Sequence, residues 1–545
     1  MFTGSFNIVG FDQYENVLTD PEFYKSLART FGFAAALVAG SVLIGMGVAQ
    51  LMTKLGPVMR WLVTFVLIFA WAMPNVASSV VWKWLFQPGY GVVNWLLTQT
   101  HLFGDVTNLS WTDNTWLAFL EIWLLVVWQA VPYIAINLYA ATTQVDKSCL
   151  EAAQLDGCSK LRCYWQITVP LIKPSLMVIT MLSVIWDFNV FNQIWPVSQG
   201  APPRDDRDDR HLHLQEGVRV VRHRHRRRRE RAGHAHPARP DERVHPIPAQ
   251  IRGGPVMTTA TITSAAPRAK RSLSSRLRRI GTIVLAVVFC IVWIFPVYWM
   301  FVTSLKPRNQ IMTATPVFWP AKLSIDNFMV AVTQTSFLTN LKNSVIVTAV
   351  SIVLSVILAF FACAALTLYR FRGRKAIMVF VLAIQMTSGG IIPQFFIFNQ
   401  FGLLNKYSGL ILAYIAMVLP FAIWNMRGFF LNIPKDIFES AAVEGANDWQ
   451  ILWKITFPLA APGIVSTSVF AFISAWNDYM TAYTFMKDQS KYTLPVWLSS
   501  FSTPSMGTDF GGQMAASVIF SLPVVIFFMI IQRNIMKGVT TGAVK

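Results

Sequence analysis

EAAQLDGCSKLRCYWQITVPLIKP, residues 151–174, recurs in altered form as ESAAVEGANDWQILWKITFPLAAP, residues 439–462. The two stretches are offset by 288 residues, and nine of their 24 positions are identical. The identical pairs are Glu151/Glu439, Ala153/Ala441, Gly157/Gly445, Trp165/Trp453, Ile167/Ile455, Thr168/Thr456, Pro170/Pro458, Leu171/Leu459 and Pro174/Pro462. This repeat indicates an internal duplication and predicts two halves of similar structure.

Each stretch predicts a short helical hairpin. Glu and Ala favour a helix at the start, and the glycine permits a tight reversal of the chain. A second short helix is then expected to run to a stop at the Ile-Thr-x-Pro sequence, because proline removes a backbone donor. The pattern therefore predicts a compact helix-turn-helix in both halves.

Composition indicates a membrane protein. Hydrophobic residues make up 54% of the 545 residues and charged residues 13%, and the mean hydropathy is +0.46. A soluble chain of this size needs more charge to cover its surface. The net charge of +19 would suggest nucleic acid or anionic lipid as a partner, but it is unevenly placed. Much of it falls in short loops, where membrane topology explains it, so no nucleic acid partner is expected.

Ten apolar segments are long enough to cross a bilayer, which needs about 20 residues per helix. They lie near residues 31–52, 61–82, 115–141, 172–193, 281–303, 343–367, 376–399, 408–429, 462–484 and 514–533. The fold class expected is an all-α polytopic membrane protein. Prolines inside several segments favour helices packed around a path rather than helices exposed to lipid.

Basic loops orient the segments. Arg276, Arg278 and Arg279 precede residue 281, so that end is expected in the cytosol, and alternation places both repeated hairpins there too. The first half is inconsistent with this scheme. Residue 194 should emerge outside, the basic arm before residue 281 should be inside, and no apolar segment connects them. The first half is therefore expected to lack its last span.

The paired hairpins resemble the EAA loops of ABC importer permeases, whose pattern is Glu-x-Ala-x-x-x-Gly, nine residues, then Ile-x-x-Pro. The segment WKWLFQPGYGVVNWLL (82–97) is similar to the first permease subunit of carbohydrate importers. SAWNDYMTAYTFM (474–486), YTLPVWLSSF (492–501) and the Gly-Ala-Val-Lys end are similar to the second. The resemblance covers residues 7–200 and 270–545.

This resemblance implies two MetI-like helical bundles in a multi-pass protein of a prokaryotic plasma membrane. It implies that a cytosolic ABC ATPase dimer docks on the hairpins and that an extracytoplasmic solute-binding protein delivers a sugar. ATP would bind to the partner, so no cofactor and no catalytic residue are expected in this chain. The implied docking residues are Glu151, Ala153, Gly157, Ile167 and Pro170 in the first hairpin, and Glu439, Ala441, Gly445, Ile455 and Pro458 in the second.

The expected organisation is a first permease half at 1–200, a junction at 201–256 and a second half at 257–545. Arg204–Arg252 holds 14 Arg, no Lys and seven of the eight His. A basic linker for nucleic acid or anionic lipid, or a His-rich metal tract, would suit this composition. We favour a frame-shifted stretch, because permitted codons for Arg204–Arg243 read one base later can encode the missing span. Met1 is then expected to be an internal start, with a first span before it, and the nucleotide sequence of codons 195–260 decides the matter.

Polar residues in apolar segments mark a path or a packing contact. One such cluster contains Trp186, Asp187, Asn189 and Asn192, and the other contains Trp476, Asn477 and Asp478. Aromatic faces beside amides and carboxylates suit sugars. Hydrogen bonding that only holds the bundle together is the alternative, more so for the second cluster.

Several function classes find no support. The chain has no Gly-rich phosphate loop, no zinc helix with paired His and no Gly-x-Ser-x-Gly elbow, and its five Cys lack zinc-site spacing, so no metal site is expected. A permease of the same fold for a polyamine, an amino acid or phosphate remains an alternative. An ion-coupled transporter or a membrane-embedded enzyme is a third, less favoured because Asp187 and Asp478 lie near the predicted ends of their spans.

Overall fold

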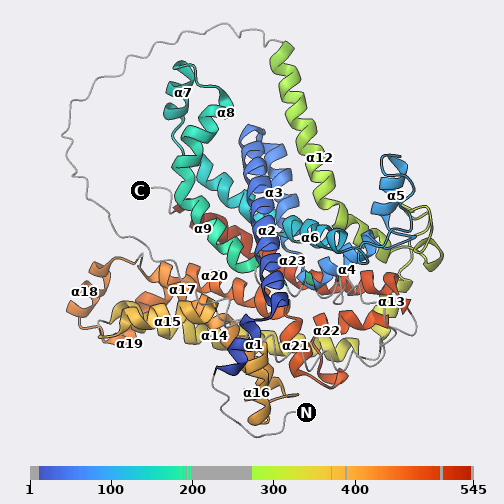
Figure 1. Ribbon diagram of the computed structural model, residues 1–545. Helices are drawn as coiled ribbons and strands as arrows, with labels where there is room; N and C mark the ends of the chain where they lie inside the picture. Colours follow the sequence, from blue (N-terminus) through green and yellow to red (C-terminus); the bar gives the residue numbers. More distant parts are fainter. Residues whose placement is uncertain are drawn as a thin grey trace. The chain divides into compact units, whose positions relative to one another are not determined.

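The computed structural model describes residues 11–187, 190, 193–194, 197, 273–334, 336–369, 371–386, 390–431, 433–503 and 507–541. The regular elements of these residues are helices (Figure 1). Among the described elements, one antiparallel pair of two-residue strands, β1 (Ser502–Thr503) and β2 (Gly507–Thr508), is the exception. The predicted all-α class is confirmed.

Residues 11–187 contain the described helices of the first half. They are α1 Asp12–Leu18, α2 Pro21–Lys54, α3 Pro57–Trp71, α4 Asn75–Leu85, α5 Val92–Gln99, α6 Thr115–Thr143, α7 Lys147–Leu155, α8 Lys160–Cys163, the π-helical turn η1 Tyr164–Thr168, and α9 Val169–Asp187.

The second half begins with α12. Its elements are α12 Leu273–Ser304, η2 Arg308–Gln310, α13 Asp326–Thr333, α14 Phe337–Leu368, α15 Arg374–Met386, α16 Ile391–Gln400, α17 Tyr407–Leu431, α18 Lys435–Val443, α19 Asp448–Gln450, the π-helical turn η3 Ile451–Thr456, α20 Phe457–Trp476, α21 Met480–Phe485, η4 Gln489–Lys491, α22 Leu494–Leu498, η5 Ser499–Phe501 and α23 Phe510–Thr541.

Two compact units contain these elements. Residues 1–30 and 207–285 form one unit, of which the structure describes α1 and the starts of α2 and α12. Residues 31–206 and 286–545 form the other, larger unit. The expected junction at 201–256, including the Arg/His-rich stretch, lies outside the described residues.

Eight described helices are long and apolar enough to cross a membrane, or nine if one bent pair counts as a span. That pair is α3 and α4, which meet at 98°, so the segment expected to span at 61–82 is two helices with a sharp bend between them. Pro74 precedes α4 with extended backbone, and a proline cannot donate the hydrogen bond that would continue α3. The seventh expected span, at 376–399, is described as α15 and α16, and residues 387–389 between them lie outside the described residues.

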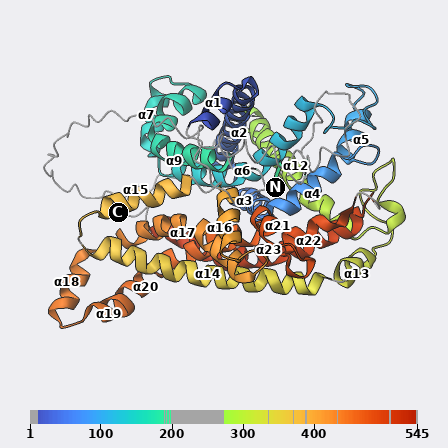
Figure 2. The same cartoon turned by 60° about the horizontal axis from the view of Figure 1, so that its bottom comes forward.

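Close packing joins α14, α17 and α20 in the second half (Figure 2). Small buried residues such as Ala359, Ala422 and Ala460 let these helix backbones approach, as is typical of helix pairs in membranes. The Cys363 thiol lies 3.1 Å from the carbonyl oxygen of Ile423 across the α14–α17 contact. This three-helix core positions α20, which follows the second hairpin.

In the first half, α6 packs between α3 and α9. Met46, Ile134, Leu138, Ile172 and Ile179 form a buried cluster that fixes α9 against α2 and α6. The second half anchors the segment 492–501 differently: the Asn343 amide donates to the carbonyl oxygens of Ser490 at 2.8 Å and Tyr492 at 3.0 Å.

Aromatic residues connect the two halves inside the larger unit. The rings of Trp84 and Phe510 have centroids 4.2 Å apart, and the Trp128 indole N–H donates to the Trp293 carbonyl oxygen at 2.9 Å. These buried contacts join α4 to α23 and α6 to α12. The Trp128 indole is paired across this contact, whereas the buried indole N–H groups of Trp84 and Trp293 have no hydrogen-bond partner among the described residues.

Labelling of cysteines tests the predicted sidedness. Cys149 is exposed on α7, and we expect a membrane-impermeant maleimide to label it in inside-out vesicles and not in intact cells. Leu102 is 78% exposed in the loop predicted outside, so a Leu102→Cys control in a chain lacking the native cysteines should show the reverse. Labelling of Cys149 from outside intact cells would contradict the topology.

Candidate coupling loops and solute path

The first hairpin is closed by a left-handed glycine. The Asp146 carboxylate caps α7 by accepting from the Ser148 N–H at 3.0 Å, and this hydrogen bond lowers the pKa of Asp146. After α7, Gly157 has φ of 82°. Its N–H donates to Gln154 O at 3.1 Å, and the Cys158 N–H donates to Ala153 O at 2.9 Å. This pair of bonds is the Schellman arrangement, which satisfies the last carbonyls of a helix.

The second hairpin repeats this geometry. Gly445 has φ of 84°, its N–H donates to Ala442 O at 3.1 Å, and the Ala446 N–H donates to Ala441 O at 3.0 Å. The next short helices also begin alike, because the side chains of Ser159 and Asn447 both cap them. The predicted tight reversal at both glycines is confirmed.

The predicted stop at Ile-Thr-x-Pro is wrong in both hairpins. The chain passes through η1 or η3 and continues into α9 or α20. Pro170 and Pro458 each take the second position of the following α-helix. The π-helical turn shifts the hydrogen-bond ladder, so the missing N–H of each proline costs little there. Each hairpin is therefore connected to its span by continuous helix.

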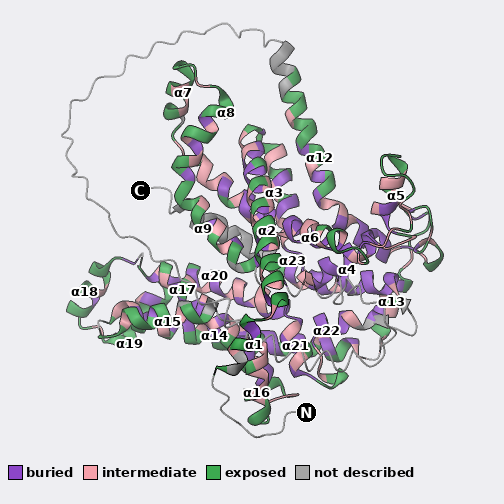
Figure 3. Cartoon of the chain, viewed as in Figure 1, coloured by how far each residue is buried: buried purple, intermediate pink, exposed green. Residues whose placement is uncertain are grey.

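Both hairpins present apolar tips to solvent (Figure 3). Leu155 and Val443, which are matched in the repeat, are each 89% exposed. Glu151 and Glu439 are exposed on the same helices, whereas Ala441 is buried and Ala153 is partly buried. Sequence reasoning missed the two tips, although an apolar residue two positions before each glycine was the available signal. Exposed apolar residues at matched sites are typical of a protein interface.

Aromatic and polar contacts support the second hairpin. Beside the second, the rings of Trp449 and Phe361 stack with centroids 6.4 Å apart, and Trp453 packs on Phe360 at 5.9 Å. The Tyr369 hydroxyl donates to the Asp448 carboxylate at 3.0 Å, which raises the pKa of Tyr369. The hairpin α18–α19 is thus fastened to α14.

Each hairpin lies within a segment that matches a known family of transport proteins. The family described as "binding-protein-dependent transport system inner membrane component" matches residues 41–191 and 257–541, one segment per hairpin. The chain belongs to this family. It is accordingly an ABC importer permease, a multi-pass inner membrane protein that works with a binding protein.

Relatives of the permease include proteins of carbohydrate uptake. It is 39% identical to the diacetylchitobiose uptake system permease protein DasC of Streptomyces coelicolor, over 51% of this chain and 99% of DasC. It is 40% identical to DasB of the same organism, over 36% of this chain and 59% of DasB. It is 33% identical to the trehalose permease protein SugB of Mycobacterium tuberculosis, over 46% of this chain and 92% of SugB. A crystal structure of a bacterial ABC transporter that imports alginate aligns with a TM-score of 0.44 and 26% identity, covering 48% of this chain and 98% of that chain.

The first polar cluster of the permease is partly described. Trp186 is 39% exposed and packs edge-on against Tyr133, with ring centroids 5.1 Å apart. Asp187 is buried at the end of α9, and its Oδ2 atom has no hydrogen-bond partner among the described residues. Asn189 and Asn192 lie outside the described residues. The assignment of this cluster to the solute path stays a prediction.

The second polar cluster is largely satisfied by its own bundle. The Trp476 indole N–H donates to Phe520 O at 3.3 Å. The Asp478 carboxylate accepts from the Thr481 hydroxyl at 3.0 Å and from the Ala482 N–H at 3.1 Å. Asn477 is buried beside them, and its Oδ1 atom has no hydrogen-bond partner among the described residues. The partners of the Trp476 indole and the Asp478 carboxylate hold α20, α21 and α23 together. These contacts support the alternative in which the second cluster only stabilises the bundle.

Replacing Gly445 tests whether the left-handed turn fixes the second hairpin. A Cβ at Gly445 meets no atom within 4 Å, but φ of 84° is unfavourable for alanine, at a cost of about 1–2 kcal/mol. Gly445→Ala should therefore speed hydrogen exchange in residues 435–456. Gly428, inside α17, also has open space and no positive φ, so Gly428→Ala is the matched control and should leave exchange unchanged. Equal protection in both variants would refute the role of the turn.

Proposed function

We propose that this permease conducts a neutral sugar or oligosaccharide, with both halves of the channel supplied by one chain. The similarity to DasC, along nearly its whole length, is the observation that carries the proposal. Similarity to a second chitobiose permease protein and to a trehalose permease protein supports the same solute class. We assign residues 1–200 to the first permease half, 201–256 to a junction and 257–545 to the second half.

Energy is proposed to come from an ABC ATPase dimer that docks on the two hairpins. Leu155 and Val443 would enter apolar sites on the ATPase, while Glu151 and Glu439 would pair with basic residues at the rim. No ATP site is proposed in this chain. Apolar anchors surrounded by polar groups are the usual composition of such interfaces.

Continuous helix gives the hairpins a mechanical role. Because α8 continues through η1 into α9, and α19 through η3 into α20, displacement of a hairpin moves its span as well. The π-helical turns are the points where the hydrogen-bond ladder is weakest, and they would absorb small changes in angle. Closure of the ATPase dimer would in this way open the path on one side of the membrane and close it on the other. An extracytoplasmic binding protein would supply the sugar.

Replacing the two apolar tips tests docking. We expect Leu155→Asp with Val443→Asp to abolish copurification of the ATPase, and each single variant to weaken it about tenfold, because a charge replaces a buried apolar anchor. Leu102→Asp changes a leucine that is also exposed, at 78%, and should leave copurification intact. Full retention of the ATPase by the double variant would contradict docking through the tips.

Uptake by the reconstituted assembly tests the solute class. The chain, its ATPase and its binding protein should accumulate radiolabelled trehalose or diacetylchitobiose in an ATP-dependent and saturable way. Putrescine, glutamine and phosphate should not accumulate. Transport of one of these three solutes in place of the sugars would contradict the proposal and assign the permease to another solute class within the same family.

A further inference from the structure

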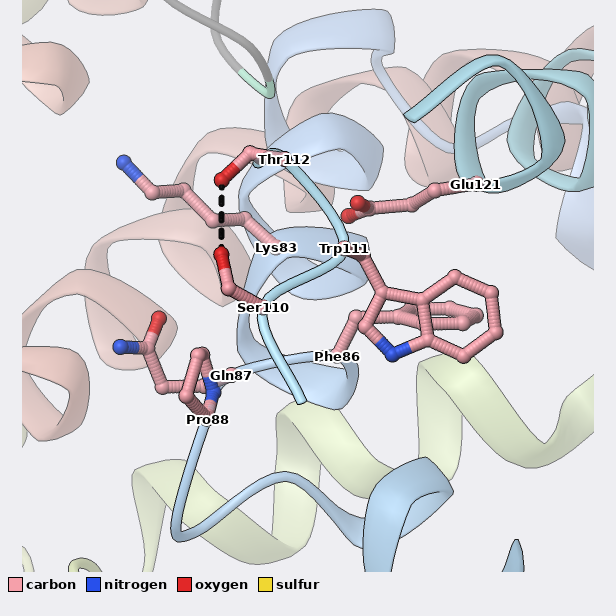
Figure 4. Close-up of a pocket in the computed structure, with 8 residues that line it drawn as sticks. All are labelled: Lys83, Phe86, Gln87, Pro88, Ser110, Trp111, Thr112 and Glu121. Atoms are coloured by element: carbon pink, nitrogen blue, oxygen red, sulfur yellow. Dashed lines mark hydrogen bonds between the residues drawn. The ribbon is translucent and has the colours of Figure 1, made fainter. Parts of the chain in front are cut away.

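A cavity of about 270 Å³ lies in the first half, and its lining includes no residue of either polar cluster. Its walls come from the end of α4, the loop that follows, the segment before α6 and the second turn of α6 (Figure 4). The lining residues are Lys83, Phe86, Gln87, Pro88, Ser110, Trp111, Thr112 and Glu121. The predicted topology places this end of α4 and α6 on the extracytoplasmic side.

Glu121 is the most unusual of these residues. Its side chain is 2% exposed, and Figure 4 shows its carboxylate directed into the cavity. Among the described residues, none donates a hydrogen bond to it or forms an ion pair with it. A buried carboxylate is normally paired, because removal from water is costly. The cavity therefore contains a strong acceptor with space in front of it.

Lys83 contributes the opposite charge to the same cavity. It lies on α4 and is partly buried, and in Figure 4 its ammonium end points away from the Glu121 carboxylate. Within the described part of the chain, Lys83 and Glu121 do not approach to ion-pair distance. A cation in the cavity would be repelled by Lys83, and an anion by Glu121. A neutral ligand rich in hydroxyls can bond to both side chains, because a hydroxyl can donate to Glu121 and accept from Lys83.

The aromatic wall is held in place before any ligand enters. Trp111 and Phe86 pack edge-to-face with ring centroids 4.7 Å apart. The Trp111 indole N–H donates to Asn94 Oδ1 at 2.7 Å, and the Asn94 amide donates to Leu109 O at 2.9 Å. The hydroxyl oxygens of Ser110 and Thr112 lie 3.3 Å apart at the rim. Rigid aromatic rings beside polar groups suit the C–H face of a sugar ring.

We propose that this cavity binds one sugar unit of a neutral saccharide at the extracytoplasmic entrance of the first half. Glu121 accepts from a sugar hydroxyl, Lys83 donates to another, and Trp111 and Phe86 contact the ring. The volume lies just below the range of about 300–1,000 Å³ for pockets that hold drug-sized ligands, which fits one unit rather than a whole oligosaccharide. This inference rests on the proposed sugar specificity and adds an entrance subsite to it.

Kinetics of the reconstituted assembly distinguish a ligand site from a simple charge pair. Glu121→Gln should raise the KM for trehalose or diacetylchitobiose about tenfold and leave the maximal rate within about twofold, because an amide replaces the carboxyl group that accepts from the sugar hydroxyl. Lys83→Met combined with Glu121→Gln removes both charges together. If the residues only balance each other, this double variant restores the original KM. The proposal requires the KM to stay raised.

Asp113 provides the matched control for these variants. It is an exposed carboxylate in the same segment and does not line the cavity. Asp113→Asn should leave both KM and maximal rate unchanged. A rise in KM for Asp113→Asn equal to that for Glu121→Gln would point to a general effect of surface charge and overturn the assignment.

A second measurement separates failure of the cavity from failure of the sugar function. Thr112→Cys at the rim should react with a membrane-impermeant methanethiosulfonate, and millimolar trehalose or diacetylchitobiose should slow the reaction at least threefold. Uptake of sugar without this protection overturns the cavity alone. Protection without uptake supports the cavity and overturns the transport proposal, and loss of both overturns both.

Discussion

A helix that reverses direction within one residue needs backbone with positive φ, and Gly157 and Gly445 provide it at matched positions. Each glycine allows two successive N–H groups to bond the last carbonyls of the helix before it. The hairpins are thereby closed by their own backbone and need no partner to hold their shape. The exposed tips Leu155 and Val443, two residues before each glycine, depend on this closure for their orientation. The same constraint explains why a repeat separated by 288 residues keeps its glycine while most other positions differ.

The hairpins matter because helix connects them to the spans. In a membrane, backbone groups must be satisfied inside the protein, which favours unbroken helices. The chain meets this requirement by running from α8 and α19 through π-helical turns into α9 and α20. A proline at each junction limits the hydrogen bonding there without ending the helix, since Pro170 and Pro458 lie in the first turn. Each half therefore has one continuous helix from its hairpin to its span, and the π-helical turn is the place where that helix bends most easily.

The fold was largely predictable from the sequence because its signals are local. The glycine reversal and most spans follow from spacing and hydropathy within about 25 residues. The predicted helix end at Ile-Thr-x-Pro was wrong because a π-helical turn accommodates the proline. Helix propensities of single residues do not predict such a turn. The bend within the segment 61–82 was not predicted, because Pro74 interrupts the helix there while Pro132 and Pro420 lie inside intact helices. The cavity was missed for another reason: Lys83, Trp111 and Glu121 are brought together from α4, a loop and α6.

Buried charge differs between the two halves. Among the described residues, four charged side chains are buried: Glu121, Asp187, Lys306 and Asp478. In the second half, Asp478 accepts two hydrogen bonds, and the Lys306 ammonium lies 4.0 Å from the centroid of the Trp299 ring. In the first half, Glu121 faces a cavity and Asp187 keeps an oxygen without a partner in the described part. A buried charge without a partner is costly to stability, so its retention favours a role in binding. This asymmetry favours a division of labour in which the first half contacts the solute and the second half supports the bundle.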